Sequence, residues 1–213
     1  MPQRDLNNMR EQYDADILLE ANCHTNPFQQ FDAWFQDAIQ QNIIEPNAMT
    51  LATVGHDGQP SARIVLLKSF DKNGFVFYSN YESHKGKQIQ ENEKVALLFW
   101  WQQRQIRIEG AVQKLDRESA MQYFHSRPIE SQIGATVSLQ SSIIESREIL
   151  DEKYDTAYKA YANKVVPLPD YWGGYLVVPT LFEFWQGRLS RLQDRIQYSL
   201  EANQDWKIER LSP

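Results

Sequence analysis

Residues 49–80 read MTLATVGHDGQPSARIVLLKSFDKNGFVFYSN, and this stretch decides the fold. It contains three runs rich in β-branched, aliphatic and aromatic residues, at 49–55, 62–70 and 75–80, which is typical of strands. The gaps HDGQP and DKNG carry the Asp, Asn and Gly residues that supply turn conformations. Three strands joined by gaps this short predict an antiparallel meander.

Further strands are predicted on the C-terminal side of this stretch. The runs at 95–101 and 104–115 are separated by only two residues, and the second alternates polar and apolar positions from Gln105 to Gly110. The last third of the chain adds runs at 173–179, 180–187, 194–200 and 205–211. Many short strands with turns between them predict a mainly β chain, folded as a small closed or partly closed barrel.

Helices are predicted at the periphery of this barrel. The run 26–43 begins with a candidate N-cap, Asn26, and spaces its apolar residues by three and four, as on one helix face: Phe28, Phe31, Phe35 and Ile39. Asp116 is a candidate N-cap for a helix over 117–126, and residues 143–163 predict a longer polar helix. We expect a single domain over residues 26–213, preceded by a mobile arm at 1–25.

Composition limits the classes of function. The 213 residues are 42% hydrophobic, which is enough for a core without disulfide bonds. The net charge of −6 argues against nucleic-acid binding, which needs clustered positive charge, but it leaves room for local basic pockets. Cys23 is the single cysteine and the four histidines are scattered, so we expect no metal site. The N-terminus has no apolar segment and no apolar run reaches about 18 residues, so we expect a cytoplasmic protein without a membrane partner.

Cationic side chains beside strands are the first candidates for chemistry. Arg63 and Lys68 flank the apolar residues of one predicted strand, and regular alternation places them on opposite faces. A charge at a strand end usually reaches back to water, which is one interpretation of both residues. If they instead share a ligand, a bulge, a strand end or a second subunit has to bring them together.

A second candidate group lies near the C-terminus. Arg191, Gln193 and Arg195 alternate in one predicted strand and therefore share a face. Two guanidinium groups on one face repel each other unless an anion or carboxylates lie between them, and arginine suits bidentate phosphate binding. Pairing with Asp or Glu is the alternative, because acidic residues are abundant in this chain.

A third candidate group follows the predicted helix at 117–126. Tyr123 and Arg127 are one helical turn apart, and Ser131 follows shortly after them. Hydroxyl groups and a guanidinium could together hold a phosphate. Alternatively, Tyr123 belongs to the core and Arg127 is a solvent-facing helix end. No Gly-rich nucleotide motif accompanies these groups, so the residue pattern alone stops at a barrel with candidate anion sites.

Four segments of the chain resemble the pyridoxamine 5′-phosphate oxidase family. They are RIVLLKSFDKNGFVFYSNYESHKGKQI (63–89), YFHSRPIESQIGA (123–135), VPLPDYWGGY (166–175) and FEFWQG with RLQDRI (182–196). They stand in the family's order, and the resemblance extends weakly over MREQY (9–13), which is similar to a short substrate-lid segment. The resemblance implies a split β-barrel homodimer with FMN in a cleft between subunits, and residues 172–213 as the region of dimerisation and substrate contact.

The resemblance also implies the site residues. FMN would be bound by residues from several segments: Arg63, Ile64, Val65, Leu66, Leu67, Lys68, Tyr78, Ser79, His84, Lys85, Gln105, Gln140, Ser141, Trp185 and Arg195. Substrate would be held by Arg10, Tyr13, Lys68, Tyr123, Arg127, Ser131, Arg191 and Gln193, and Arg191 over the pyridine ring is the catalytic candidate. The implied reaction is oxidation of pyridoxamine or pyridoxine 5′-phosphate by O₂ to pyridoxal 5′-phosphate, with release of hydrogen peroxide and, from the amine, ammonia. This reaction belongs to vitamin B6 biosynthesis and salvage.

Two positions depart from the family's pattern. Gln193 stands where the family usually has a substrate-holding His, so we expect intact FMN binding with weaker, slower and less pH-dependent handling of substrate. His84 stands where an Arg commonly joins the following Lys on the FMN phosphate, so a modest loss of FMN affinity is expected. Two alternatives stay open: a split-barrel flavoprotein with another substrate, and a flavin- or pyridoxal-phosphate-binding protein without activity.

Overall fold

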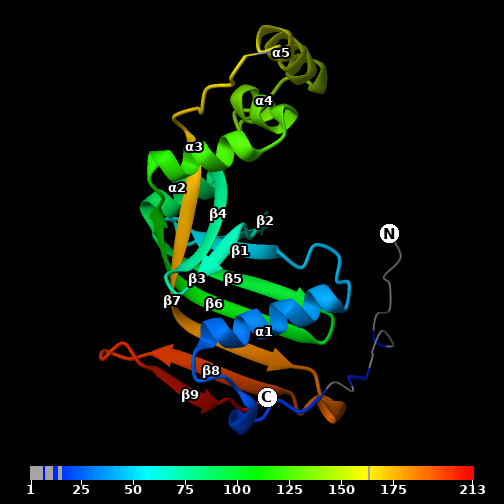
Figure 1. The fold of residues 1–213 in the computed structure, drawn as a ribbon, viewed down its shortest axis with the longest axis vertical. Helices are drawn as coiled ribbons and strands as arrows, with labels where there is room; N and C mark the ends of the chain where they lie inside the picture. Colours follow the sequence, from blue (N-terminus) through cyan, green and yellow to red (C-terminus); the bar gives the residue numbers. More distant parts are fainter. Residues whose placement is uncertain (1–6, 8–11, 14–15, 163) are drawn as a thin grey trace. The chain divides into compact units, whose positions relative to one another are not determined.

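A computed structural model describes residues 7, 12–13, 16–162 and 164–213 (Figure 1). The chain forms two compact units. Unit 1 consists of residues 1–46, 98–108 and 180–213, and unit 2 consists of residues 47–97 and 109–179. In the described part of the chain, no helix has the length and apolar character needed to cross a membrane. The single domain over 26–213 and the mobility of the arm at 1–25 stay predictions.

The strands follow one another in a path that curls on itself. Their hydrogen-bonded order is β2-β1-β5-β6-β7-β4-β3, with β8 and β9 added beyond β7. The two end strands of this path, β2 and β3, are joined by only Leu67 and Lys68, so the path has to close like a barrel. The strand bounds are β1 Ala48–Val54, β2 Pro60–Leu66, β3 Ser69–Asp71, β4 Gly74–Asn80, β5 Lys94–Trp101, β6 Arg104–Lys114, β7 Trp172–Gln186, β8 Asp194–Leu200 and β9 Trp206–Arg210.

Both hairpins of the predicted three-stranded meander are confirmed, but its middle strand is split in two. β1 and β2 pair antiparallel with Ala48 opposite Leu66, and β3, the end of the predicted strand at 62–70, pairs antiparallel with β4, which also pairs with β7. The predicted strand at 62–70 is interrupted because Leu67 donates its N–H to Asn47 on one side, whereas Lys68 donates to Val76 on the other, each at 2.8 Å. The chain therefore passes from one end of the strand path to the other at these two residues.

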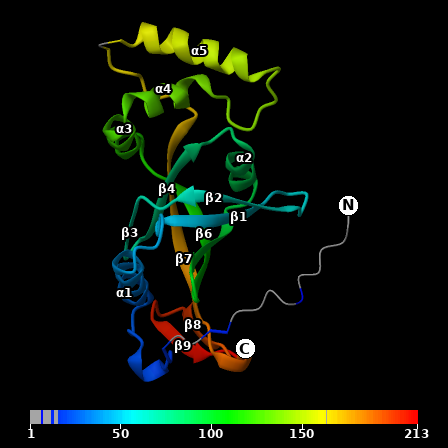
Figure 2. The ribbon, with the colours of Figure 1, turned by 90° about the vertical axis from the view of Figure 1, so that its right-hand side faces the viewer.

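The helices of unit 2 lie mostly on the connections between its strands. They are α2 His84–Glu91, α3 Arg117–Ser126, α4 Ile129–Val137 and α5 Arg147–Ala160. The predicted N-cap of α3 is confirmed, because the Asp116 carboxylate accepts the N–H of Ser119 at 2.7 Å. The pattern did not predict α2 and α4, and α5 is shorter than the predicted helix at 143–163. Figure 2 shows α4 and α5 side by side, and Phe124, Ile133 and Trp172 form a buried cluster beneath them.

Unit 1 contains α1 Pro27–Gln40 and the strands β8 and β9, with short 3₁₀ turns at Glu20–Asn22 and Leu189–Arg191. The predicted N-cap Asn26 is confirmed, since its side chain accepts the N–H of Phe28 at 2.8 Å. The predicted apolar face of α1 is displaced: Trp34 is buried, whereas Ile39 is 46% exposed. Aromatic contacts form the core, with Phe31 against Phe99 at 5.1 Å and Trp34 against Phe184 at 5.2 Å between ring centroids. The predicted runs 173–179 and 180–187 are one strand, β7.

We expect Asn26→Ala to lower the free energy of unfolding by about 1 kcal/mol, because the first turn of α1 loses the side chain that accepts one of its free N–H groups. Urea denaturation followed by circular dichroism measures this change. Asn26→Ser is the matched control, because Ser keeps a capping oxygen and should cost much less. Equal losses in the two variants would mean that the cap does not stabilise α1.

Candidate functional site

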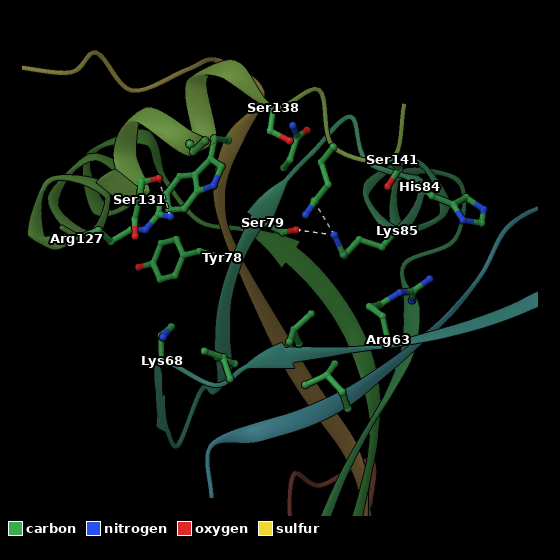
Figure 3. A pocket seen from close by; sticks show the side chains of 18 of the residues that line it. Arg63, Lys68, Tyr78, Ser79, His84, Lys85, Arg127, Ser131, Ser138 and Ser141 are labelled. Atoms are coloured by element: carbon green, nitrogen blue, oxygen red, sulfur yellow. Dashed lines mark hydrogen bonds between the residues drawn. The ribbon is translucent and has the colours of Figure 1, made fainter. Parts of the chain in front are cut away.

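A cavity of about 1170 Å³ in unit 2 is the candidate site. It is larger than the roughly 300–1,000 Å³ of common small-molecule sites, and so has room for an extended ligand or two ligands. Its lining includes five basic side chains, and among the described residues that line it none is acidic. Figure 3 shows that these side chains form two groups: Arg63, His84 and Lys85 toward one end, and Lys68 and Arg127 toward the other, beside Tyr78 and Ser131. The cavity therefore suits anionic groups at two places.

The Lys85 ammonium is the most constrained charge in this cavity. Lys85 lies in the first turn of α2, is only 9% exposed, and donates to Ser79 at 2.9 Å, Ser83 at 3.2 Å and Gln140 at 2.8 Å. All three acceptors are neutral, and in the described part of the chain no carboxylate pairs with this ammonium. Burial, together with the nearby charge of Arg63, lowers the pKa of Lys85 to about 8. A bound anion would supply the missing negative charge.

Arg63 is held in a similar way at the same end of the cavity. Its guanidinium donates to the carbonyl oxygens of Leu51 and Ser61, at 3.0 and 3.2 Å, and to the side chains of Thr53 and Gln88. These acceptors are again neutral, and burial lowers the pKa of Arg63. Lys68 lies in the gap between β2 and β3 and lines the same cavity. Arg63 and Lys68 thus line one cavity but lie toward different ends of it, and a ligand shared by both stays a prediction.

Tyr123, Arg127 and Ser131 come together at the other end of the cavity. The Arg127 guanidinium lies 4.8 Å from the ring of Trp172 and donates one N–H to the carbonyl oxygen of Ser131 at 3.0 Å. Its second nitrogen, Nη1, is buried and has no hydrogen-bond partner among the described residues. Tyr123 stacks on Tyr78 with a centroid separation of 3.8 Å. Arg127 is half-buried rather than a solvent-facing helix end, and its free N–H is available to a ligand.

The site residues predicted in the C-terminal region belong to unit 1. The prediction that Arg191, Gln193 and Arg195 share one strand face is wrong, because Arg191 lies in a 3₁₀ turn and β8 begins only at Asp194. Arg195 lies opposite Trp185 in the register of β7 and β8, and it donates to the buried Glu183 at 2.8 Å. The alternative of carboxylate pairing therefore holds for Arg195.

Tyr13 and Gln105 also belong to unit 1. Gln105 is half-buried in β6. The ring of Tyr13 packs edge-on against Trp185, with 5.9 Å between centroids, so the arm and the FMN candidate Trp185 are in contact. Arg10 lies outside the described residues. Ile64, Val65 and Leu66 line the cavity of unit 2, and so do Gln140 and Ser141; Leu67, in contrast, is buried at 4% exposure.

The sequence interpretation missed two residues that support the candidate site, Ser83 and Gln88. Ser83 caps α2 by accepting the N–H of Gly86 and also accepts from Lys85. A serine three residues before a glycine in a short polar run carries too weak a helix signal to be noticed. Gln88 accepts from both Thr53 and Arg63, at 2.7 and 3.4 Å, and no sequence pattern marks that long-range contact.

Comparisons with known proteins agree with this geometry. Residues 35–160 match the family described as pyridoxamine 5′-phosphate oxidase, and residues 172–213 match the pyridoxine 5′-phosphate oxidase C-terminal dimerisation region. A pyridoxine/pyridoxamine 5′-phosphate oxidase of Trichormus variabilis is 49% identical over 212 residues, 99% of each chain. The protein of the same description from Aliarcobacter butzleri is 50% identical over 98% of this chain and 100% of its own.

Two solved structures resemble this fold. PhzG of Burkholderia lata, in complex with tetrahydrophenazine-1-carboxylic acid, has a TM-score of 0.87 at 27% identity and covers 93% of this chain and 98% of its own. A pyridoxamine 5′-phosphate oxidase-related, FMN-binding protein of Nostoc punctiforme has a TM-score of 0.72 at 17% identity, covering 89% of this chain and 100% of its own, and shows the fold alone. The split-barrel fold expected from the sequence is confirmed.

We expect Lys85→Met to raise the free energy of unfolding of the ligand-free protein at pH 7 by about 1 kcal/mol, because it removes a buried ammonium without a carboxylate partner. In the wild type, the folded-state pKa of about 8 lies below the usual Lys value of 10.5, so the unfolded chain binds more protons between these values. Wild-type stability relative to the variant should therefore rise as pH increases from about 8 to 10.5.

Urea denaturation at pH 7 and at pH 10 measures this difference. Lys87→Met is the matched control, because Lys87 is exposed on the same helix and its removal should change little at either pH. A Lys85→Met variant that is less stable than the wild type by the same margin at both pH values would show that the ammonium stabilises the fold without an anion.

Proposed function

Because this chain belongs to the pyridoxamine 5′-phosphate oxidase family, we propose that it oxidises pyridoxamine 5′-phosphate and pyridoxine 5′-phosphate to pyridoxal 5′-phosphate with O₂ as electron acceptor. Family membership makes the chain an oxidoreductase with FMN as its cofactor. The observation that carries the proposal is one cavity with two separate groups of basic side chains, because FMN and the substrate each bring one phosphate ester.

The FMN phosphate is assigned to the end of the cavity around Lys85. The buried ammonium of Lys85, the hydroxyl of Ser79 and the guanidinium of Arg63 offer charged and neutral donors whose present partners are uncharged. His84, in the same turn of α2, lines this end as well. A dianionic phosphate fits this donor set, since it would supply the negatively charged partner that the Lys85 ammonium lacks. The buried Lys85 ammonium, whose hydrogen-bond acceptors are all neutral, is thus the observation on which the fit of FMN depends.

The substrate phosphate is assigned to the end around Arg127. The buried, unpartnered Nη1 of Arg127 can donate to a phosphate oxygen without giving up an existing bond. The hydroxyl groups of Ser131 and Tyr123 and the exposed ammonium of Lys68 line the same end. Together they would bind a phosphate ester and leave the pyridine ring toward the middle of the cavity, beside Tyr78.

The chain contributes binding and orientation, whereas the cofactor contributes the redox chemistry. When bound, FMN would supply the two-electron oxidation at the 4′ carbon of the substrate, with O₂ as the final acceptor and hydrogen peroxide as the reduced product. The protein holds the 4′ carbon in place by its grip on the two phosphates and excludes water from the buried part of the cavity. The imine left by the amine substrate then hydrolyses to the aldehyde and ammonia.

The remaining assignments rest on a homodimer. The match of residues 172–213 to a dimerisation region supports two copies in the active protein. We propose that dimerisation completes each cavity with candidate residues from unit 1. Five of the described candidates are assigned to this role: Tyr13, Gln105, Trp185, Arg191 and Arg195. Arg191 is exposed, so its guanidinium is free to lie over the pyridine ring.

A different substrate is the second candidate, and the likeness to PhzG favours it. PhzG is described in complex with a tricyclic carboxylic acid, and at 27% identity it shares this fold closely. The group around Arg127 could also bind a carboxylate. The two candidates differ in whether turnover depends on a phosphate ester.

Oxygen uptake and peroxide release test the proposed function. The purified dimer should carry a yellow flavin spectrum and consume O₂ with pyridoxine 5′-phosphate but not with pyridoxine, because the Arg127 end has no ligand without the phosphate. Formation of the aldehyde is followed by its absorbance. A yellow protein that is bleached by a phenazine precursor and not by either phosphate ester would favour the second candidate, and a colourless protein that binds no added FMN would exclude both.

We expect Arg127→Gln to raise the KM for pyridoxine 5′-phosphate roughly ten- to a hundredfold, because a charge-assisted bond to phosphate is lost. Bound FMN should stay unchanged in this variant. Lys85→Gln should show the opposite pattern, with weaker FMN binding and an unchanged KM once FMN is saturating. Steady-state kinetics and flavin fluorescence measure the two quantities. Loss of FMN from Arg127→Gln would show that the two ends of the cavity are assigned wrongly.

A further inference from the structure

The connection between β7 and β8 presents Arg191 in an unfavourable backbone conformation. Ser190 and Arg191 follow each other with φ values of 59° and 60°, in the left-handed region that non-glycine residues rarely occupy. Two such residues in succession persist only where the surrounding structure holds them. The orientation of the Arg191 side chain therefore depends on the contacts that close this connection.

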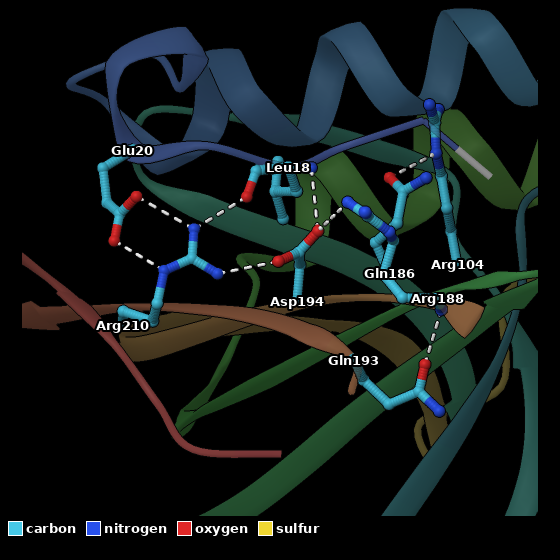
Figure 4. A network of polar contacts seen from close by, with 8 residues as sticks. All are labelled: Leu18, Glu20, Arg104, Gln186, Arg188, Gln193, Asp194 and Arg210. Carbon is cyan, nitrogen blue, oxygen red and sulfur yellow. Dashed lines mark hydrogen bonds and ion pairs between the residues drawn. The ribbon is translucent and has the colours of Figure 1, made fainter. Parts of the chain in front are cut away.

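Gln193 makes the contact that closes it. The side-chain carbonyl oxygen of Gln193, Oε1, accepts the backbone N–H of Arg188 at 2.6 Å, across the turn that contains Arg191 (Figure 4). Because a backbone N–H can only donate, this bond also fixes which end of the amide faces Arg188. The carbonyl oxygen of Gln193 is thus used inside the protein.

Asp194 anchors both ends of the same turn. Its carboxylate is 9% exposed and accepts from the Arg188 guanidinium at 2.9 Å, from the Arg210 guanidinium at 2.8 Å and from the N–H of Leu18 at 3.1 Å. The bond from Arg188 ties the start of the turn to the first residue of β8. The Arg188–Asp194 ion pair and the Gln193 bond both span the two left-handed residues, and of these two the Gln193 bond is the one that holds the backbone of the turn.

We propose that Gln193 is a positioning residue: it acts through Arg191 by accepting the Arg188 N–H and thereby holding the left-handed turn. This inference rests on the proposed function, since it requires that Arg191 lies over the substrate. It differs from the role implied by the family resemblance, in which the residue at this position touches the substrate itself. Loss of the bond would let Ser190 and Arg191 relax to negative φ, and fewer molecules would present the guanidinium correctly.

Three variants, assayed with saturating FMN at pH 8, test this role. Gln193→Met removes the acceptor at similar length and should lower kcat/KM roughly tenfold, the effect of about one hydrogen bond on the population of the productive turn. Gln193→Glu keeps an oxygen acceptor and should stay within about threefold of the wild type. If the NH₂ group of Gln193 instead donated to the substrate, Glu would be the more damaging change, and the proposal would be overturned.

A double-mutant cycle shows whether Gln193 acts through Arg191. Arg191→Ala should remove most of the activity, and adding Gln193→Met to it should change kcat/KM by less than about twofold, because no guanidinium is left to position. If the double variant lost kcat/KM by the product of the two single-variant losses, the two residues would act independently, which would overturn the proposal. Flavin content and unfolding temperature, measured for each variant, separate a local effect from misfolding.

The pH dependence of kcat/KM in the Gln193→His variant distinguishes positioning from substrate contact. A ring nitrogen of the introduced His can accept the Arg188 N–H only when the imidazole is neutral, so kcat/KM should rise with pH through the imidazole pKa. The charged residues next to this position in the turn are Arg188, whose N–H it accepts, Arg191 and Asp194. A substrate contact by a cationic His would give the opposite trend, with kcat/KM falling as pH rises.

The two hypotheses fail in different ways. A wild-type protein that does not oxidise either phosphate ester would contradict the proposed function. An active wild type whose Gln193→Met variant has the same kcat/KM would contradict only the positioning role.

Discussion

The buried ammonium of Lys85 is the interaction on which the site depends. The fold places a positive charge among three neutral oxygens at the start of α2 and provides no carboxylate for it. Such a charge is unfavourable in the empty protein, and this cost becomes binding energy when an anion arrives. Arg63 repeats the arrangement nearby with backbone carbonyl groups as acceptors. Stability is thus reduced at a place that suits an anion.

The second group of basic side chains depends on the junction of two helices. Arg127 lies between α3 and α4, where it stacks on Trp172 and keeps one N–H unpaired. The closure of the strand path at Leu67 and Lys68 adds a further cation to this end. Strands and helical connections therefore both contribute to each end of a single cavity. Two ligands that both carry phosphate can be held in a fixed order by such a division.

Local chemistry could be predicted from the sequence, whereas long-range pairing could not. The caps Asn26 and Asp116 were correct because a capping side chain bonds only two or three residues ahead. The split of the meander's middle strand was missed because the break at Lys68 depends on Val76, a partner that turn residues do not specify. The shared face of Arg191 and Arg195 was wrong because a left-handed turn precedes β8, and no glycine announces it. The site residues of unit 2 came from resemblance to a family, not from periodicity.

One carboxylate links parts of the chain that are made at very different times. Asp194 and Arg210 together hold Leu18 and Glu20, and the Glu20–Arg210 contact joins residues 190 positions apart. During synthesis, the segment around Leu18 leaves the ribosome long before its partners exist. It must stay undocked until β9 has been translated and folded. The attachment of the segment around Leu18 is therefore an event that follows the synthesis of β9.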